Sequence, residues 1–232
     1  MGYFRASIKT NSMKKIAFLL LLFISNFTFS QTPKEIDSVS MELCDYLKTL
    51  SKIKNDTLKI TTLYQDKLYP YLGTFEESKI DAAGQRVYYR LQRNCVGFRE
   101  LLDRLEPPKE KIVRITTKPV TKLNKKQLAE FKKRTQFKYK EFDGSDTYVE
   151  MKDNKWTDTF TNNTYSKLTY KWLSDDEFQL TFIESNNETR SNFSFEGDKF
   201  NYIVLDIKDD HYLVSVNIEG QNIYEEFKLF FE

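Results

Sequence analysis

Residues 167–187 have the sequence KLTYKWLSDDEFQLTFIESNN, and the two-residue alternation in this stretch decides the fold class. Apolar and polar residues alternate on both sides of a polar break, which places the apolar side chains on one face of each strand. The break is Ser174-Asp175, whose short polar side chains favour a turn. The stretch therefore predicts a half-buried β-hairpin. Its apolar positions are Leu168, Tyr170, Trp172, Phe178, Leu180 and Phe182.

The same pattern extends over residues 131–232. Runs rich in aromatic residues and threonine are separated by turn-forming pairs every 9–13 residues, the spacing of short antiparallel strands in a barrel or sandwich. The pairs leave about nine strand candidates, and short turns favour pairing between consecutive strands. We expect an antiparallel up-and-down β-meander that forms a lipocalin-like half-barrel. The pairs are Asp143-Gly144, Asp153-Asn154, Asn162-Asn163, Ser174-Asp175, Asn186-Asn187, Gly197-Asp198, Asp209-Asp210 and Glu219-Gly220.

The preceding residues, 34–105, have a helical period instead. Apolar residues recur there at three- and four-residue steps in three segments, as in amphipathic helices. Asn55-Asp56 offers a cap for the second segment, and Pro70 is expected to stop it. The third segment is expected to be one unbroken helix that ends at Leu105. The chain is thus predicted to be an α+β protein that begins with a helical hairpin or three-helix bundle.

The first 30 residues have the features of a secretory signal peptide. Lys14 and Lys15 precede nine consecutive apolar residues, and small and aromatic residues then lead to Ser30. Nine apolar residues are too few for a membrane span, which takes ~20. We expect cleavage near Gln31, export to the periplasm or the extracellular space, and no membrane span in the mature chain. Translation could start at Met1 or at Met13.

These patterns divide the chain into four segments. They are a signal peptide (1–30), a helical domain (31–108), a basic linker with a short helix (109–130) and an antiparallel β domain (131–232). Without the signal peptide the formal net charge falls from +2 to −2, and no segment has the clustered, strongly basic surface typical of nucleic-acid binders. The basic linker is better explained as a solvated connector than as a docking site for anions.

Two cysteines, Cys44 and Cys95, remain in the expected mature chain. An even pair in an exported protein is typical of one disulfide. A redox pair usually has CxxC spacing, and a metal site needs further ligands, whereas the chain has no third cysteine and a single histidine. We therefore predict a disulfide that joins the first helical segment to the third.

The β half contains enough aromatic residues to line a wide interior. A small barrel either fills with side chains or holds one small ligand, while aromatic residues on its outer face could stack on sugars. If a pocket exists, we expect it to be lined by Tyr139, Tyr170, Trp172, Phe178, Phe182 and Tyr202.

No motif for catalysis or cofactor binding stands out. His211 has no GxSxG nucleophile elbow to serve, and the chain lacks a glycine-rich phosphate loop. Acidic turns such as Asp175-Asp176 and Asp209-Asp210 could bind a hard cation, but solvated turns explain them equally well. We expect no enzymatic activity, no cofactor, no metal ion and no nucleic-acid partner.

Short motifs occur in a fixed order at 131–133, 137–139, 171–178, 183–187 and 197–200, among them KWLSDDEF and GDKF. Together they resemble a group of small exported bacterial β proteins of unknown function, whose members have FKxGxF, KWxSDCEY and GDKFxY motifs and are in some cases mislabelled as topoisomerases. The helical half resembles cysteine-bearing helical segments of similar exported proteins. The group's central cysteine is Asp176 here and its usual partner is replaced near Ala129, so the resemblance implies that this second bridge is absent.

Two non-catalytic hypotheses follow from the sequence, and an enzyme is the third and least favoured. An enzyme would require two or three carboxylates that converge with a tyrosine or His211 in one cleft. The first is a non-catalytic binding module, whose barrel holds a small apolar or sugar ligand in a concave aromatic pocket. The second is a scaffold or protein-interaction module of the cell envelope, with a filled barrel and an exposed apolar patch on the helices. They differ in whether the barrel interior is hollow.

Overall fold

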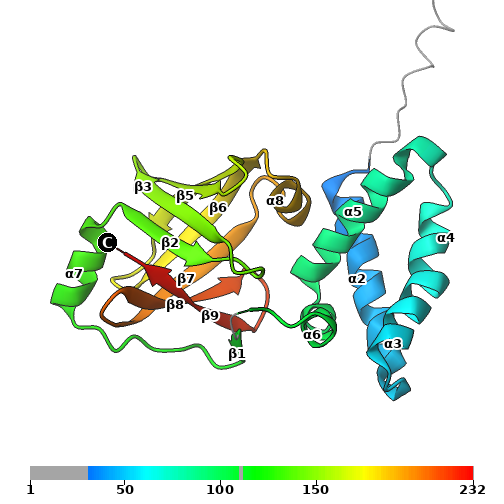
Figure 1. Ribbon diagram of the computed structural model, residues 1–232, viewed down its shortest axis with the longest axis horizontal. Coiled ribbons are helices and arrows are strands. Elements are labelled where there is room, and N and C mark those ends of the chain that lie inside the picture. Colours follow the sequence, from blue (N-terminus) through cyan, green and yellow to red (C-terminus); the bar gives the residue numbers. More distant parts are fainter. Residues whose placement is uncertain (1–30, 110–111, 232) are drawn as a thin grey trace, which may run out of the picture. The chain divides into compact units, whose positions relative to one another are not determined.

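The computed structural model describes residues 31–109 and 112–231, so the predicted signal peptide lies outside the described residues. Residues 33–232 form one compact unit, in which helices precede a β-barrel (Figure 1). The α+β class predicted from the two periodicities is confirmed. In the described ranges, the helices are too short or too polar to cross a bilayer.

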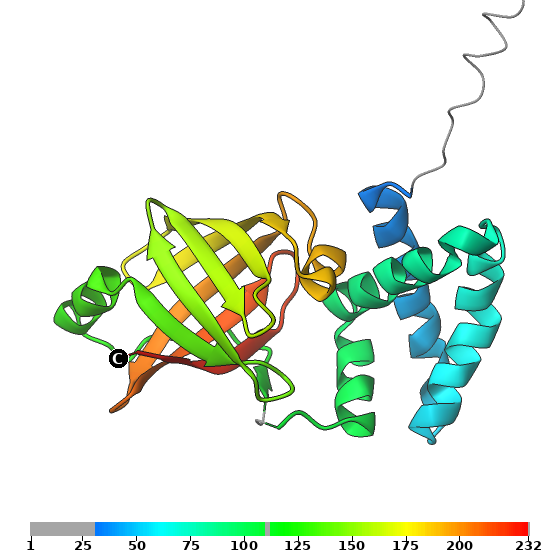
Figure 2. The ribbon, with the colours of Figure 1, turned by 45° about the horizontal axis from the view of Figure 1, so that its top comes forward.

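Strands β2 to β9 form a closed antiparallel barrel. Each strand pairs with the next along the chain, and β9 pairs with both β8 and β2, so the sheet closes on itself (Figure 2). The predicted up-and-down meander is confirmed, and its closure makes it a complete barrel instead of a half-barrel. The strands are β2 (Gln136–Lys140), β3 (Asp146–Lys152), β4 (Lys155–Phe160), β5 (Tyr165–Trp172), β6 (Glu177–Ser185), β7 (Lys199–Ile207), β8 (His211–Ile218) and β9 (Tyr224–Phe230).

One of the nine strand candidates is a helix. The sequence predicts a strand between Asn186-Asn187 and Gly197-Asp198, but the structure has α8 (Glu188–Phe193) there. The Asn187 side chain accepts a hydrogen bond from the backbone N–H of Arg190 at 3.2 Å, which caps the first turn. A cap supplied by the turn itself thus starts a helix where the spacing of turns suggested a strand.

The segment expected to be a linker contributes a ninth strand and the helix that closes the barrel. Strand β1 (Val113–Ile115) pairs antiparallel with the first half of β9. Helix α7 (Lys125–Lys133) begins at a capping box formed by Asn124 and Gln127.

Helix α7 closes one end of the barrel with a single aromatic side chain. Phe131 is 0% exposed, and its ring lies 4.8–6.1 Å from the rings of four barrel residues. Lys132 lies over the ring of Trp172 at 4.3 Å and so covers this cluster from outside. The end of the barrel under α7 is therefore filled. The four barrel residues are Phe137, Trp172, Phe178 and Tyr212.

The helical region departs from the prediction at Pro70. The second segment does not stop there, because a π-helical turn at Tyr64–Leu68 precedes Pro70 and the chain continues as helix to Leu72. A π turn changes the hydrogen-bond spacing, which accommodates the missing N–H of proline. The helices are α2 (Pro33–Thr49), α3 (Asp56–Leu63), α4 (Tyr69–Leu72), α5 (Glu77–Asn94) and α6 (Val96–Leu105), with a 3₁₀ turn at Leu50–Lys52.

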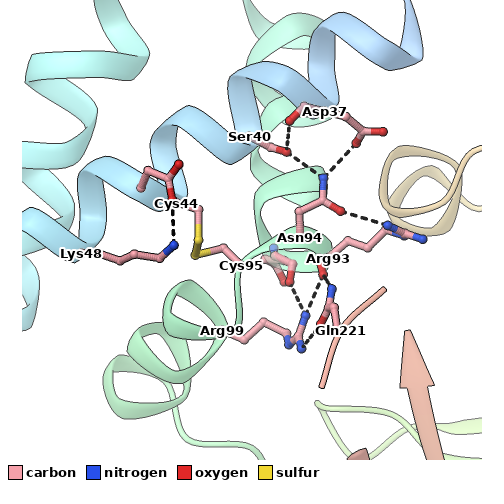
Figure 3. Close-up of a disulfide and its surroundings, with 11 residues drawn as sticks. Asp37, Ser40, Cys44, Lys48, Arg93, Asn94, Cys95, Arg99 and Gln221 are labelled. Atoms are coloured by element: carbon pink, nitrogen blue, oxygen red, sulfur yellow. Dashed lines mark hydrogen bonds and ion pairs between the residues drawn. A yellow bond between two sulfur atoms is a disulfide. The ribbon is translucent and has the colours of Figure 1, made fainter. Parts of the chain in front are cut away.

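The third predicted helix is broken at Cys95, contrary to expectation. Cys95 has an extended backbone (φ −124°, ψ 100°) that separates α5 from α6. The break leaves carbonyl groups at the end of α5 without helical donors, and side chains replace these donors. Arg99 Nη1 donates to the Arg93 carbonyl at 2.9 Å, and Gln221 Nε2 donates to the same oxygen at 2.6 Å (Figure 3).

The predicted disulfide is confirmed. Cys44 of α2 and Cys95 are bonded, with their Cα atoms 5.5 Å apart (Figure 3). The bridge spans 51 residues of sequence and ties α2 to the junction of α5 and α6. Closing a loop of this length restricts the unfolded chain and stabilises the native helices by a few kcal/mol, roughly 2–5.

Replacing Phe131 with alanine tests its role as the plug of the barrel. We expect Phe131→Ala to lower the free energy of unfolding by about 3–5 kcal/mol, because it removes a buried ring from a packed aromatic cluster. Urea denaturation measures the loss. The control is Lys133→Ala in the same helix, whose side chain is 71% exposed and whose loss should cost at most about 0.5 kcal/mol. Equal stability of the two variants would contradict the plug.

Candidate functional site

The end of the barrel opposite α7 is hollow. Helix α8 lies at this end (Figures 1 and 2), and a cavity of about 750 Å³ lies inside the strands. This volume is within the range of small-molecule sites, roughly 300–1,000 Å³. The walls are largely aromatic and aliphatic, as alternation in the strands requires. Central wall residues are Trp156, Leu180, Phe182, Phe200, Tyr202 and Phe227.

Incomplete pairing of β9 accounts for an opening in the side of the barrel. Strand β2 pairs with β9 at Lys138 and Phe230, whereas the other half of β9 pairs with β1. Near the gap between these two contacts, the cavity lining includes Lys140 and Lys228. Alternation along β2 and β9 places both residues on the outer face of the barrel. The cavity therefore reaches the surface between β2 and β9.

Three of the six predicted pocket residues line the cavity, namely Tyr139, Phe182 and Tyr202. Phe178 is fully buried one layer deeper, where its ring stacks on Tyr202 at 5.0 Å. The other two, Tyr170 and Trp172, pack against the filled core.

Asp158 is the buried acidic group of the cavity wall. It is 7% exposed, and its Oδ1 accepts a hydrogen bond from the indole Nε1–H of Trp156 at 2.8 Å. Both residues are on β4 and point inward. A carboxylate among apolar walls was not expected from the sequence. Asp158 is, however, two residues from both Trp156 and Phe160, and this alternation could have indicated that it faces inward.

Arg190 brings a positive charge to the same cavity from α8, but that charge is already paired. Its Nη2 donates to both carboxylate oxygens of Glu141, each at 2.6 Å. Thr147 Oγ1 donates to Glu141 Oε1 at 2.5 Å. Among the ion pairs within 31–109 and 112–231, none involves Asp158, and its hydrogen-bond donors are neutral, namely the indole of Trp156 and the phenol of Tyr139.

This environment changes the protonation of the cluster. Burial raises the pKa of Asp158 to about 6, although hydrogen bonding by Trp156 and the charge of Arg190 act in the opposite direction. Burial also raises the pKa of Tyr139 and of Tyr202, so both phenols keep their protons at neutral pH. Asp158 is thus an ionised carboxylate at pH 7.5, and the hydrogen bonds from Trp156 and Tyr139 and the charge of Arg190 offset its burial only in part.

The helical region holds α8 over the cavity through one buried arginine. Arg90 of α5 is 1% exposed, and its Nη1 donates to the Phe193 carbonyl at the end of α8 at 2.9 Å. The same guanidinium forms an ion pair with Asp198 and donates to both carboxylate oxygens of Asp37 at 2.7 and 2.9 Å. Phe193 and Arg190 line the cavity, so the helices position part of its wall.

The single histidine lies away from this site. His211 Nδ1 contacts Asp210 Oδ1 at 2.6 Å, and its ring packs on Phe230 outside the cavity lining. In the part of the chain that the structure describes, no group of three or more potential metal ligands comes together.

No family model matches the chain, and comparisons with curated proteins and with solved structures find no match either. Function is therefore inferred from the cavity and the residues that line it.

The pKa of Asp158 predicts how stability depends on pH. Because the folded-state pKa of about 6 exceeds the ordinary 3.8, the folded protein binds this proton more tightly than the unfolded chain does. Lowering the pH from 7.5 to 5.0 should therefore add about 1–2 kcal/mol to the stability of the wild type through this group. Asp158→Asn should lack that contribution.

Urea denaturation at both pH values, for the wild type and the variant, measures the difference. Asp209→Asn, in an exposed turn, is the matched control and should keep the pH dependence of the wild type. An identical response to pH in wild type and Asp158→Asn would show that Asp158 is not desolvated.

Proposed function

We propose that this chain is an exported, non-catalytic binding protein that holds one small ligand inside its barrel. The observation that carries the proposal is the cavity of about 750 Å³ at the α8 end. Its walls combine apolar area with a few polar groups, the usual composition of a small-molecule site. Of the two hypotheses from the sequence, the hollow barrel supports the binding module over a scaffold with a filled interior.

Export is supported by two independent features. The Cys44–Cys95 disulfide is of a kind that persists mainly in oxidising compartments such as the periplasm and the extracellular space. The sequence of residues 1–30 has the order of charged, apolar and small residues that directs secretion. Both features fit a protein that meets its ligand outside the cytoplasm.

The resemblance to small exported bacterial β proteins fits the same proposal. The KWLSDDEF stretch covers the hairpin of β5 and β6, and GDKF leads into β7. These are structural positions: Trp172 and Phe178 belong to the filled end, and Phe200 to the wall of the cavity. Membership of that group would imply a shared barrel without assigning a particular ligand.

A neutral fluorescent probe tests whether the cavity binds small molecules. N-phenyl-1-naphthylamine gains fluorescence in apolar surroundings, and we expect the wild type to bind it with a stoichiometry of one. Val216→Phe places a ring in the cavity wall and should weaken binding at least about tenfold, equivalent to about 1.4 kcal/mol.

The matched control for this experiment is Val120→Phe, which adds the same ring at a position that is 79% exposed. Circular dichroism checks that both variants keep the wild-type fold. The proposal fails if the wild type does not bind the probe, or if the folded Val216→Phe variant binds it as tightly as the Val120→Phe control.

A further inference from the structure

The charges around the cavity are unevenly paired. Arg190 Nη2 donates hydrogen bonds to both carboxylate oxygens of Glu141, so the charges of these two groups neutralise each other. Asp158 accepts hydrogen bonds from two neutral groups, the indole of Trp156 and the phenol of Tyr139, and forms no ion pair with any described residue. The three ionisable groups therefore leave one net negative charge beside an apolar space, which is costly to bury without a partner.

Four aromatic rings line the same cavity as this negative charge. Trp156 and Tyr202 have their ring centroids 6.0 Å apart, Tyr202 and Phe227 6.1 Å, and Tyr139 and Phe227 5.9 Å. All four line the cavity, and Trp156 also holds Asp158 directly. Faces of aromatic rings attract cations, most strongly where water is excluded. A carboxylate inside a set of aromatic rings is a site suited to an ammonium group.

The remaining charged groups of the lining do not reverse this preference. Glu225 is engaged by Arg99 at 3.1 Å and by Arg114 at 2.9 Å. Lys140 and Lys228 occupy positions on the outer face, at the opening between β2 and β9, and Glu226 faces outward in step with Lys228. An anion inside the cavity would reach Arg190 only beside the carboxylates of Glu141 and Asp158, which would repel it.

We infer that the ligand is an amphiphilic organic cation. Its ammonium group pairs with Asp158 within the rings of Tyr139, Trp156 and Tyr202, and its apolar body fills the rest of the cavity. This inference rests on the proposed function and adds the chemical class of the ligand. An incoming cation supplies the counter-charge that Asp158 lacks, and the apolar body gains from leaving water.

Three compounds that share one indole body test the charge preference. Tryptamine is cationic at neutral pH, indole-3-ethanol is neutral and indole-3-acetate is anionic, and each is used to displace bound N-phenyl-1-naphthylamine at pH 7.5. We expect tryptamine to displace the probe at a concentration at least about tenfold lower than indole-3-ethanol, with indole-3-acetate the weakest competitor.

Variants then assign the preference to the buried carboxylate. Asp158→Asn should lose the advantage of tryptamine over indole-3-ethanol while still binding indole-3-ethanol, and Asp209→Asn should keep the wild-type order. For the wild type, tryptamine should bind about tenfold more weakly at pH 5.0 than at pH 7.5, because protonated Asp158 no longer offers a charge. Asp158→Asn should show no such change.

The outcomes separate this inference from the proposed function. Suppose that the wild type binds the fluorescent probe. The inferred cationic ligand is then overturned, with the binding function left in place, if tryptamine has no advantage, if indole-3-acetate binds more tightly, or if none of the three compounds competes. A preference for tryptamine that survives in Asp158→Asn also overturns it. Failure of the wild type to bind the fluorescent probe overturns both.

Discussion

The interior of an eight-stranded barrel is the constraint on which the rest of this structure depends, because it is only just wide enough to be filled by side chains. Here the filling is confined to one end. Phe131 enters from α7 and completes a cluster with Phe137, Phe178 and Tyr212, whereas Arg190 and Phe193 of α8 line the wall of the other end without filling it. The space that remains is the cavity. The packed core and the cavity thus lie at opposite ends of one barrel, which explains how a small barrel can be both well packed and hollow.

The helical region has a definite part in this arrangement. Arg90 is nearly inaccessible to solvent, yet its guanidinium group has partners on three sides. These are Asp37 of α2, the end of α8 and Asp198. A buried cation is tolerated only when its donors are satisfied, so removing either carboxylate would leave a costly charge. The disulfide stabilises the helices that present Arg90. The helices therefore act as a support for α8, which carries Arg190 and Phe193 into the cavity wall.

The sequence predicted which side chains of a strand face the barrel interior, but not how far along the barrel axis each side chain lies. Alternation identified Trp172, Phe178 and Phe182 as inward-facing, and all three are packed inside the barrel. Alternation carries no information on height along the barrel axis, so it could not separate Trp172 at the filled end from Phe182 at the cavity. Closure between β9 and β2 and the pairing of β1 depend on contacts between distant segments. The break at Cys95 and the pairing of Arg190 with Glu141 likewise arise from tertiary contacts that no local pattern records.

Native mass spectrometry of the mature chain, purified from its own host without added ligand, shows whether the barrel holds a small molecule. We expect a protein mass increased by one small molecule, and loss of that molecule in the Val216→Phe variant prepared in the same way. Detection of the unliganded mass alone for the wild type, or of a small molecule that Val216→Phe retains equally, would contradict a ligand held inside the barrel.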